Sequence, residues 1–354
     1  MNLQEHVPLA PLTTLGVGGT ARFFIEAHTE KDIEDAIAFA RQHTLPLFTF
    51  GGGSNILVPD AGIEGVVLKM TLRDIKMEEE GESILLDAGA GAPWEEVVDK
   101  AGTHGIFGIE NLAGIPGFVG GAAVQNIGAY GAELSDVFEY ADSIDSTTGV
   151  KRRMTRIDAA FAYRTSMFKK QRELVITRVA LRLAKRAVPN IAYADLDRAS
   201  AEGTPLSTPV EIARAVRSIR ASKFPRSVLE GTAGSFFKNP VVSNEKAAEL
   251  ARAFPGIPIF PVVNGSVSAG GGSASGRKLS LAWLLDHALS LKGFSRGQVR
   301  LYEKQPLVIV TRAGARATDV DALAREVVER VFTATGIRIE REVETFGAKV
   351  IHTS

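Results

Sequence analysis

Apolar and polar positions near the start of the chain follow first a helical and then a strand-like pattern. Over residues 31–44, apolar side chains recur three and four positions apart, and Thr29 with Asp32 has the pattern of a capping box. This pattern predicts an amphipathic helix whose apolar face consists of Ile33, Ala36, Ile37 and Ala40. Short apolar runs at 45–50, 56–58 and 65–70 predict strands, so residues 1–70 are expected to form a compact α/β unit.

Strand patterns dominate the middle of the chain. The run at 83–88 predicts a strand, and a helix is expected to begin at Pro93. Residues 173–185 alternate between two sets of side chains, one of which contains Arg178 and Arg182, and this alternation predicts a half-buried strand. Residues 186–208 are looser in composition, and we expect them to form a linker or a mobile segment.

A helix start marks the beginning of the C-terminal part. Thr208, Pro209 and Glu211 combine a capping box with proline at the first helical position. Further patterns predict helices at 209–222, 244–253, 279–290 and 318–334, and strands at 306–311 and 337–344. We therefore expect three parts, 1–70, 71–207 and 208–354, of which the last is α+β and can return its final strand to the N-terminal region.

Composition narrows the class of protein. The chain has 354 residues, which at roughly 150 residues each is enough for two to three domains. Its 41 Lys and Arg residues balance 41 Asp and Glu residues, so no excess positive charge is present for non-specific nucleic-acid binding. The sequence has no cysteine, which excludes disulfides and thiolate chemistry, and its six scattered histidines do not suggest a metal site, so we expect no metal.

Two uncharged runs, 112–132 and 253–276, could suggest membrane spans. Both contain glycine, proline and asparagine, and lipid would leave such backbones without hydrogen-bond partners. The first six residues also lack the charged and apolar regions of a signal peptide. We therefore expect a soluble protein without membrane insertion.

Glycine is the outlier of the composition, with 35 residues, about 10% of the chain against a typical ~7%. Three glycine-rich runs fail as nucleotide-binding motifs. The run 16–21 precedes a predicted strand instead of following one, so it does not fit the Rossmann pattern. The run 89–94 lacks the third glycine and an acidic ribose partner, and in the run 271–280 Arg277 separates Gly276 from Lys278, which rules out a P-loop.

Two further glycine-rich runs have the composition of ligand-contacting loops. Residues 51–55 (GGGSN) lie between two predicted strands, where they can present backbone N–H groups to an anion or simply form a tight turn. Residues 111–131 contain six glycines and few large polar side chains. Such a run favours backbone packed closely against a flat, extended ligand, and close internal packing is the alternative.

Five ordered motifs together resemble the UDP-N-acetylenolpyruvoylglucosamine reductase family over nearly the whole chain. These motifs are GGGSN at 51–55, GAG at 89–91 with Trp94, GIPG at 114–117 through QNIGAYG at 125–131, YRTSMF at 163–168 and GSFFKNP at 234–240. The resemblance implies an α+β fold with a two-part FAD-binding domain of the vanillyl-alcohol-oxidase (PCMH) type, at 1–70 and 71–207. It also implies a C-terminal α+β substrate domain at 208–354 and the subgroup that carries an extra tyrosine loop.

The family reduces the enolpyruvyl ether of UDP-N-acetylglucosamine to UDP-N-acetylmuramate, a cytoplasmic step of peptidoglycan synthesis. The resemblance therefore implies an NADPH-dependent oxidoreductase with non-covalent FAD, acting on a small-molecule substrate. We expect a monomer that binds no nucleic acid. The implied cofactor contacts are Gly51, Gly52, Gly53, Ser54, Asn55, Gly114, Ile115, Pro116, Gly117, Gly121, Ala122, Gln125, Asn126, Gly128, Ala129, Tyr130 and Gly131.

The resemblance also implies three catalytic residues. Arg164 would bind the substrate carboxylate region and polarise the enolate that forms when flavin N5 delivers hydride to C3. Ser235 would be the general acid that protonates C2. Glu342 matches the C-terminal glutamate of the family, although Glu340 and Glu344 share its predicted strand face and leave the choice among the three open.

The remaining matches imply substrate contacts. Lys223 would contact the diphosphate, and Tyr193 would lie on a loop that closes over the substrate, where Ala194 replaces the commoner glycine. Lys278 could instead simply begin the 279–290 helix. Two rival hypotheses are another flavin-dependent oxidoreductase of this fold and a non-catalytic nucleotide-sugar binding protein. The full set of implied substrate contacts is Tyr163, Tyr193, Lys223, Asn239, Lys278 and Gln305.

Overall fold

A computed structural model describes residues 1–225, 229–262 and 276–347. The chain divides into two compact units. The first consists of residues 1–7, 21–52 and 64–222, and the second of residues 8–20, 53–63 and 223 onward. Each unit has a hydrophobic core of its own. Within the described ranges, no helix is long and apolar enough to cross a membrane.

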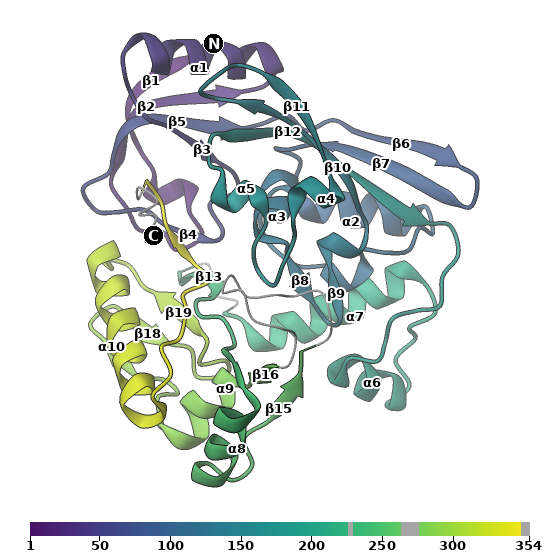
Figure 1. The fold of residues 1–354 in the computed structure, drawn as a ribbon, viewed down its shortest axis with the longest axis vertical. Helices are drawn as coiled ribbons and strands as arrows, with labels where there is room; N and C mark the ends of the chain where they lie inside the picture. Colours follow the sequence, from purple (N-terminus) through teal and green to yellow (C-terminus); the bar gives the residue numbers. More distant parts are fainter. Residues whose placement is uncertain (226–228, 263–275, 348–354) are drawn as a thin grey trace. The chain divides into compact units, whose positions relative to one another are not determined.

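One amphipathic helix lies along the N-terminal sheet of the first unit (Figure 1). Helix α1 (Glu30–Gln42) starts after Thr29, whose side chain accepts the Asp32 N–H while the Asp32 carboxylate accepts the Thr29 N–H. The predicted helix and its capping box are therefore confirmed, and its four apolar positions are buried. The strand order of the sheet is β1-β2-β5-β3, with β1 (Leu3–Pro8), β2 (Thr20–Ala27), β5 (Ile63–Met70) and β3 (Leu47–Phe50).

The second sheet of this unit has five antiparallel strands and a deeply buried centre. Strand β12 (Leu174–Ala184) lies between β10 (Phe138–Asp145) and β7 (Ser83–Gly89), and helix α3 (Val119–Gln125) packs against it. Arg182 is the single exposed residue of β12, so the expectation of a half-buried strand is wrong, because neighbours cover both of its faces. The strand order is β11 (Lys151–Thr155), β10 (Phe138–Asp145), β12 (Leu174–Ala184), β7 (Ser83–Gly89) and β6 (Ile75–Glu80).

Short elements connect these sheets and carry the glycine-rich run 111–131. Helix α2 (Trp94–Thr103) begins directly after Pro93, at the predicted place. The hairpin β8 (Gly128–Ala129) and β9 (Ala132–Glu133) follows α3. The other short elements are η2 (Glu110–Leu112), η3 (Leu134–Asp136), α4 (Arg156–Ala159) and α5 (Met167–Lys170).

The segment expected to be a linker contains a helix. Helix α6 (Ala194–Ala201) has Leu196 as its single buried residue, which explains why the hydrophobic pattern did not predict it. Helix α7 (Pro209–Lys223) then begins at the predicted proline and buries Ile212 and Val216. The C-terminal segment of the second unit begins at the last residue of this helix.

The second unit is built around a sheet with the strand order β13-β19-β18-β17. Helix α10 (Ala317–Thr335) lies beside strands β17 and β18 and buries Val320, Leu323 and Val327 in the core of this unit (Figure 1). A three-stranded sheet, β14-β16-β15, completes the unit together with helix α8 (Asn244–Ala253). The strands are β13 (Gly231–Ser235), β19 (Val308–Thr311), β18 (Val299–Leu301), β17 (Ser295–Arg296), β14 (Val241–Ser243), β16 (Gly276–Leu279) and β15 (Ile259–Pro261).

Two predicted elements of this unit are shorter than expected. The helix expected at 279–290 consists of α9 (Leu281–Trp283) and a π-helical turn, η4 (Leu284–Ala288). The strand expected at 337–344 is reduced to β20 (Glu344–Thr345), which pairs in parallel with β4 (Ile56–Leu57). The residues before β20 form one antiparallel bridge, Phe237 with Arg341, and the Arg341 side chain donates a hydrogen bond to Asp321 of α10. The runs 253–276 and 271–280 lie partly outside the described residues.

Candidate functional site

Three glycine-rich segments meet in the first unit. The turn at 89–92 exchanges backbone hydrogen bonds with the segment 117–120: the N–H groups of Val119 and Gly120 donate to Ala92 and Ala90 at 3.0 and 2.9 Å. Gly52 packs against the same segment, since a Cβ atom on Gly52 would stand 2.8 Å from the Gly117 Cα. Runs that are far apart in the sequence are therefore brought into one cluster, as expected of a site that holds one ligand by its backbone.

The glycines of this cluster have two different environments. A Cβ atom on Gly120 would stand 2.9 Å from the Ala90 Cβ, so this glycine is required by close packing. Around the Cβ positions of Gly51 and Gly121, by contrast, no atom of the described residues lies within 4 Å apart from the chain neighbours and, for Gly121, the backbone of its own helix. Backbone that is tightly packed on one side and open on the other can accept a flat ligand at close range. This surface fits an extended dinucleotide such as FAD.

Gly114 is held from both sides by charged side chains. Its N–H donates to the Glu95 carboxylate at 2.7 Å, and its carbonyl accepts a hydrogen bond from the Arg220 guanidinium at 3.0 Å. Arg217, one turn before Arg220 on α7, pairs with Glu95 and Asp99 of α2. Burial lowers the pKa of Arg220 below its ordinary value, although the group stays charged at any physiological pH. This network fixes the backbone of the glycine segment against two helices.

The arginine predicted to be catalytic sits at the tip of a tight turn. Ala162 and Thr165 exchange backbone hydrogen bonds of 3.0 and 3.1 Å, so Tyr163 and Arg164 are its two central residues. Arg164 has a left-handed backbone, with φ of 55°. Its guanidinium donates to the Gly128 carbonyl at 2.5 Å, and a Cβ atom on Gly128 would stand 2.7 Å from the same group. A side chain at position 128 would therefore clash with the Arg164 guanidinium, and glycine avoids this clash.

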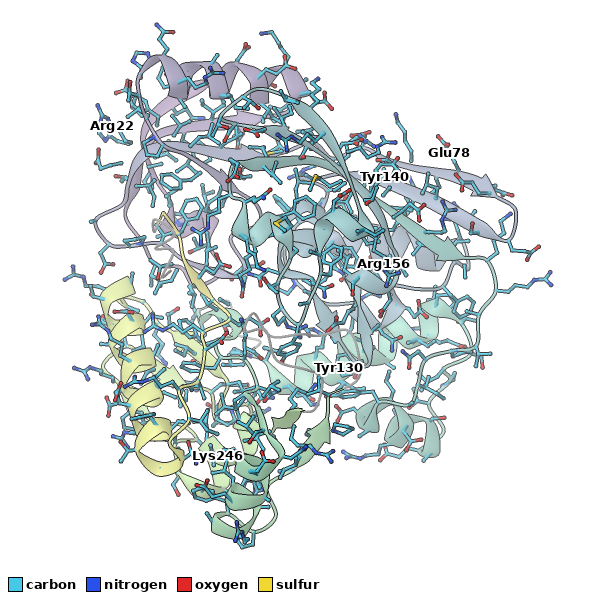
Figure 2. All side chains as sticks on the ribbon, in the orientation of Figure 1. Arg22, Glu78, Tyr130, Tyr140, Arg156 and Lys246 are labelled. Atoms are coloured by element: carbon cyan, nitrogen blue, oxygen red, sulfur yellow. The ribbon has the colours of Figure 1, made fainter. Side chains whose placement is uncertain are left out.

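Tyr193 contacts the glycine-rich run, where its loop is held by two asparagines. The rings of Tyr193 and Tyr130 meet edge to face with their centroids 5.3 Å apart (Tyr130 is labelled in Figure 2). Asn111 donates to the carbonyls of Tyr130 and Asn190, both at 2.8 Å, and Asn190 donates to Gly131 at 3.1 Å. Burial raises the pKa of Tyr130 to about 12, so its phenol remains protonated.

In the second unit, Ser235 and Glu342 lie on adjacent stretches of backbone. Glu342 N–H donates to the carbonyl of Phe236 at 2.8 Å, one residue after Ser235. Gly234 has φ of 73°, and an irregularity in the pairing of β13 with β19 precedes Ser235. Bulges of this kind commonly re-aim a side chain near a site. The fully buried rings of Phe236 and Phe237 anchor the stretch.

The three candidate glutamates differ in their surroundings. Glu340 is exposed and forms an ion pair with Lys238 at 2.8 Å. Glu342 and Glu344 are both half-buried, and Glu344 belongs to β20. Asn55 donates its side-chain amide to the Glu342 carbonyl at 3.1 Å and accepts the Glu344 N–H at 3.2 Å. These two hydrogen bonds connect the GGGSN run with residues 342–344, which we call the glutamate segment. The spacing of the sequence did not indicate this contact.

The remaining predicted substrate contacts lie in the second unit, at a helix end, within a strand or between elements. Lys223 is the last residue of α7, and Lys278 is in β16, opposite Val241 and Phe260. Asn239 accepts the Leu281 N–H at 3.0 Å, which gives it a role in the entry to α9. Gln305 lies in the turn between β18 and β19, where its carbonyl accepts the Val308 N–H at 2.9 Å.

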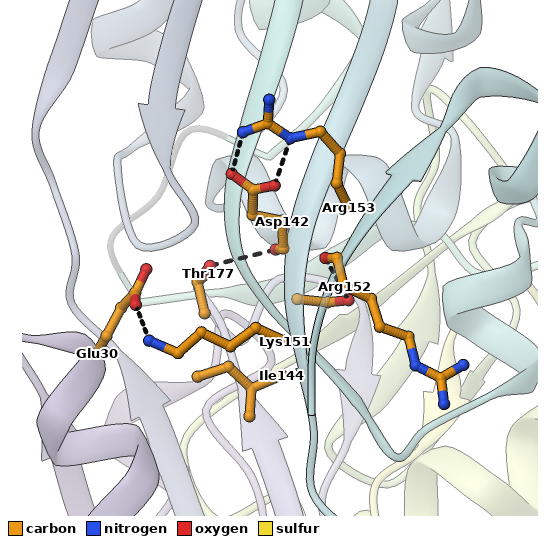
Figure 3. Close-up of a pocket in the computed structure, with 8 residues that line it drawn as sticks. Glu30, Asp142, Ile144, Lys151, Arg152, Arg153 and Thr177 are labelled. Carbon is orange, nitrogen blue, oxygen red and sulfur yellow. Dashed lines mark hydrogen bonds and ion pairs between the residues drawn. The ribbon is translucent and has the colours of Figure 1, made fainter. Parts of the chain in front are cut away.

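A pocket on the first unit is lined by other residues. Arg153 donates two hydrogen bonds of 2.8 and 2.9 Å to Asp142, and Lys151 donates one of 2.7 Å to Glu30 (Figure 3). Arg152, which also lines the pocket, pairs with Asp145 at 3.4 Å, so each cation at the pocket already has a carboxylate partner. We assign no function to it.

Comparison with known proteins gives two family matches and close relatives over nearly the full length. Residues 21–153 match the family described as FAD binding domain, and residues 225–346 match "UDP-N-acetylenolpyruvoylglucosamine reductase, C-terminal domain". A UDP-N-acetylenolpyruvoylglucosamine reductase from Pseudomonas aeruginosa is 37% identical over 97% of this chain and 98% of that protein. One from a Shewanella species (strain ANA-3) is 38% identical over 96% of both chains.

Solved structures show the same fold. The UDP-N-acetylenolpyruvylglucosamine reductase of Thermus caldophilus is similar with a TM-score of 0.66 and 25% identity, over 98% of this chain and 100% of that chain. The 6-hydroxy-D-nicotine oxidase of Arthrobacter nicotinovorans, at 14% identity, shares the fold with a TM-score of 0.51 over 94% of this chain and 83% of its own. The predicted α+β fold with an FAD-binding domain of the vanillyl-alcohol-oxidase (PCMH) type is confirmed.

Proposed function

This chain belongs to the UDP-N-acetylenolpyruvoylglucosamine reductase family, and we propose that it reduces the enolpyruvyl ether of UDP-N-acetylglucosamine to UDP-N-acetylmuramate, using FAD and NADPH. The observation that carries this proposal is similarity to reductases over 97% of the chain. We place the reaction in peptidoglycan precursor synthesis, in the cytoplasm, where nucleotide sugars and NADPH are supplied. We also propose that the enzyme is a monomer, with FAD bound by residues 1–207 and substrate by 208–354.

The glycine cluster is the proposed flavin-binding surface. The open Cβ positions of Gly51 and Gly121 support this assignment. The hydrogen bonds of Glu95 and Arg220 to the Gly114 backbone, which we call the Gly114 clamp, also support it. With no cysteine in the chain, a covalent thioether to the flavin cannot form. The chemistry that FAD supplies when bound is hydride transfer from NADPH to C3 of the enolpyruvyl group.

Arg164 is proposed to bind the substrate carboxylate and stabilise negative charge as it spreads from C2 into that group. A guanidinium is always charged and has its donors in a fixed fork, so it suits a planar carboxylate. The left-handed turn and the bond to Gly128 limit the positions that this guanidinium can take. A charge held in place before the reaction needs little reorganisation during it.

Ser235 is proposed to give its hydroxyl proton to C2. A serine hydroxyl is a weak acid at neutral pH, so this step requires a strongly basic carbon centre and a well-oriented donor. Glu342 is proposed to assist at the same step, and its backbone bond to Phe236 supports the pairing of the two residues. Lys223 is proposed to contact the substrate diphosphate, and Tyr163, Tyr193, Asn239, Lys278 and Gln305 are proposed as the other substrate contacts.

Purification and a coupled assay test this function. The protein should be yellow, release FAD on denaturation, and consume NADPH over many turnovers only when the enolpyruvyl substrate is present, with UDP-N-acetylmuramate identified by mass spectrometry. A colourless protein that binds the nucleotide sugar without FAD would favour a non-catalytic binding protein. A flavoprotein that leaves this substrate unchanged would be another oxidoreductase of the same fold.

A further inference from the structure

We propose that Asn126 is a positioning residue: its buried side-chain amide holds the turn that carries Arg164. Asn126 has an exposed fraction of 0% and ends α3 in a left-handed conformation, with φ of 45°. Asparagine adopts this conformation more readily than most residues, so the chain can turn sharply here. The side chain then points into the first unit and contacts two separate segments, 133–135 and Ala162.

The amide of Asn126 uses all of its hydrogen-bonding groups within the protein. Its Nδ2 donates to the Glu133 carboxylate at 2.9 Å and to the Ala162 carbonyl at 3.1 Å. Its Oδ1 accepts the Ser135 N–H at 3.0 Å. Both N–H donors of the amide are thus engaged. The side chain therefore serves the protein framework, although the resemblance suggested a direct cofactor contact for this residue.

The acceptor Ala162 is the first residue of the Arg164 turn, and the segment 124–128 holds that turn at further points. Beyond the turn, Ser166 Oγ donates to the Val124 carbonyl at 2.8 Å. The Arg164 guanidinium itself donates to Gly128. Since Asn126 fixes the entrance of the turn and Ser166 its exit, the Arg164 backbone has little freedom to move. The side-chain amide at 126 thereby determines where the guanidinium stands.

The position requires a neutral amide and not a carboxylate. Aspartate at 126 would lack both donors and would face Glu133, so two negative charges would meet in a buried place. Exchanging the two groups, in Asn126→Asp with Glu133→Gln, restores the contact between positions 126 and 133. The exchanged pair still has no donor for Ala162. This double variant therefore distinguishes the effect of the contact between positions 126 and 133 from the effect of the hydrogen bond to Ala162, which holds the Arg164 turn.

The inference rests on the proposed role of Arg164, and a double-mutant cycle with hydrogen exchange tests it. Asn126→Gly keeps the left-handed backbone and removes only the amide. We expect kcat/KM to fall about 100-fold, since misplacement of a reacting group by ~1 Å costs that much. In an Arg164→Ala background the same change should lower kcat/KM by less than about threefold, because Asn126 acts on the reaction through the Arg164 guanidinium, which that background lacks. Amide exchange of peptide 160–168, measured by mass spectrometry on the FAD-loaded protein, should become faster.

The control is Asn111→Ala, which removes another buried amide of the same unit that also donates two hydrogen bonds but does not touch the turn. Exchange of peptide 160–168 should match that of the wild type in this variant. If Asn126→Gly does not fold, the exchanged pair should give the same losses. Unchanged exchange at 160–168, or an undiminished loss in the Arg164→Ala background, would overturn the inference. If Arg164→Ala alone left kcat/KM intact, the proposed role of Arg164 would fail, and the exchange result would still decide whether Asn126 holds the turn.

Discussion

Asn55 donates its side-chain amide to the main-chain carbonyl of Glu342 at 3.1 Å, across 287 residues of sequence. Its own carbonyl accepts the Glu344 N–H, so one residue of the GGGSN run fixes both sides of the glutamate segment. The short parallel pair β4 and β20 continues this contact. Asn55, the last residue of the proposed cofactor loop, therefore holds the backbone of the proposed proton-transfer segment within the second unit.

Replacing Asn55 with aspartate should impair substrate reduction more than flavin reduction. The variant loses the donor to Glu342 and places a negative charge against a carbonyl, so the glutamate segment is no longer held. We expect the rate of flavin reoxidation by substrate to fall about tenfold, the effect of losing one good hydrogen bond. Stopped-flow absorbance of the two half-reactions measures this directly.

Asn244→Asp is the matched control for that variant. Asn244 uses its Oδ1 to accept a hydrogen bond from Arg277, and an aspartate can accept the same bond. Both half-reactions should keep their wild-type rates. Equal losses in the two half-reactions of Asn55→Asp would contradict a specific role in holding Glu342.

Ser235→Ala should separate the two half-reactions completely. NADPH should still bleach the flavin, because the serine is not needed for that step, whereas product formation should fall by a factor of 100 to 10,000, a loss on the order of the contribution of general acid catalysis. Rapid-quench analysis of product measures the second step. The control is Ser243→Ala, which removes the cap of α8 elsewhere in the same unit and should leave both steps intact. Normal product formation by Ser235→Ala would remove this residue from proton transfer.

The sequence predicted local structure well wherever a residue pattern determines it. The capping box at Thr29 and Asp32 and the proline at the start of α7 are local signals, and both helices begin where they were expected. Helix α6 was not predicted, because it buries only Leu196. The expected strand at 337–344 is reduced to Glu344 and Thr345, and the residues before it make one antiparallel bridge, Phe237 with Arg341, a tertiary contact that no local pattern reveals.

The candidate site could be predicted in its composition but not in its connections. The glycine-rich runs could be recognised from the sequence alone, because so many glycines in a short segment indicate that the backbone packs closely against a ligand or against other backbone. The side-chain amide of Asn126 donates a hydrogen bond to a residue 36 positions away in the sequence, and that of Asn55 to a residue 287 positions away. The clamp on Gly114 likewise depends on α7 lying against α2. Such contacts follow from packing, so only the folded chain assigns these side chains to positioning roles.

Arg220→Ala should weaken FAD binding. The variant removes the donor to the Gly114 carbonyl and one side of the clamp on the proposed flavin segment. We expect the dissociation constant of FAD from the apoprotein to rise about tenfold, in keeping with the loss of a charge-assisted hydrogen bond. Quenching of flavin fluorescence on titration with apoprotein measures it. Arg214, an exposed arginine of the same helix, provides the control Arg214→Ala, which should bind FAD like the wild type. Equal affinity of all three proteins would show that the clamp does not act on the cofactor.

Asp60 should contribute a pH-dependent stability to the second unit. Its carboxylate accepts the N–H groups of Ala317 and Thr318, at 2.8 and 3.0 Å, and so caps α10. Burial raises the pKa of Asp60, but these hydrogen bonds outweigh burial and hold the pKa below its ordinary value of 3.8. Stability from a depressed pKa is fully present above the unfolded value and is lost as the pH falls through the folded value. Asparagine has no charge to stabilise the helix N-terminus and one acceptor oxygen for two N–H groups, so Asp60→Asn should cost about 1 kcal/mol near pH 7.

Melting temperatures at neutral pH and near pH 3 test this prediction. The difference between wild type and Asp60→Asn should be largest at neutral pH and should shrink in acid, as the wild-type carboxyl becomes protonated. Asp286→Asn, which removes a surface partner of Lys292, should have little effect at either pH. A difference that stays constant or grows in acid would contradict the assignment of the cap.

Anaerobic reoxidation of the reduced flavin tests the proposed function most directly. Enzyme with one equivalent of FAD is bleached with NADPH in the absence of oxygen, and UDP-N-acetylglucosamine enolpyruvate is then added. The oxidised flavin absorbance should return in a single turnover with formation of UDP-N-acetylmuramate, whereas UDP-N-acetylglucosamine, which lacks the enolpyruvyl group, should leave the flavin reduced. A flavin that stays reduced after addition of the enolpyruvyl substrate would contradict the proposed reaction.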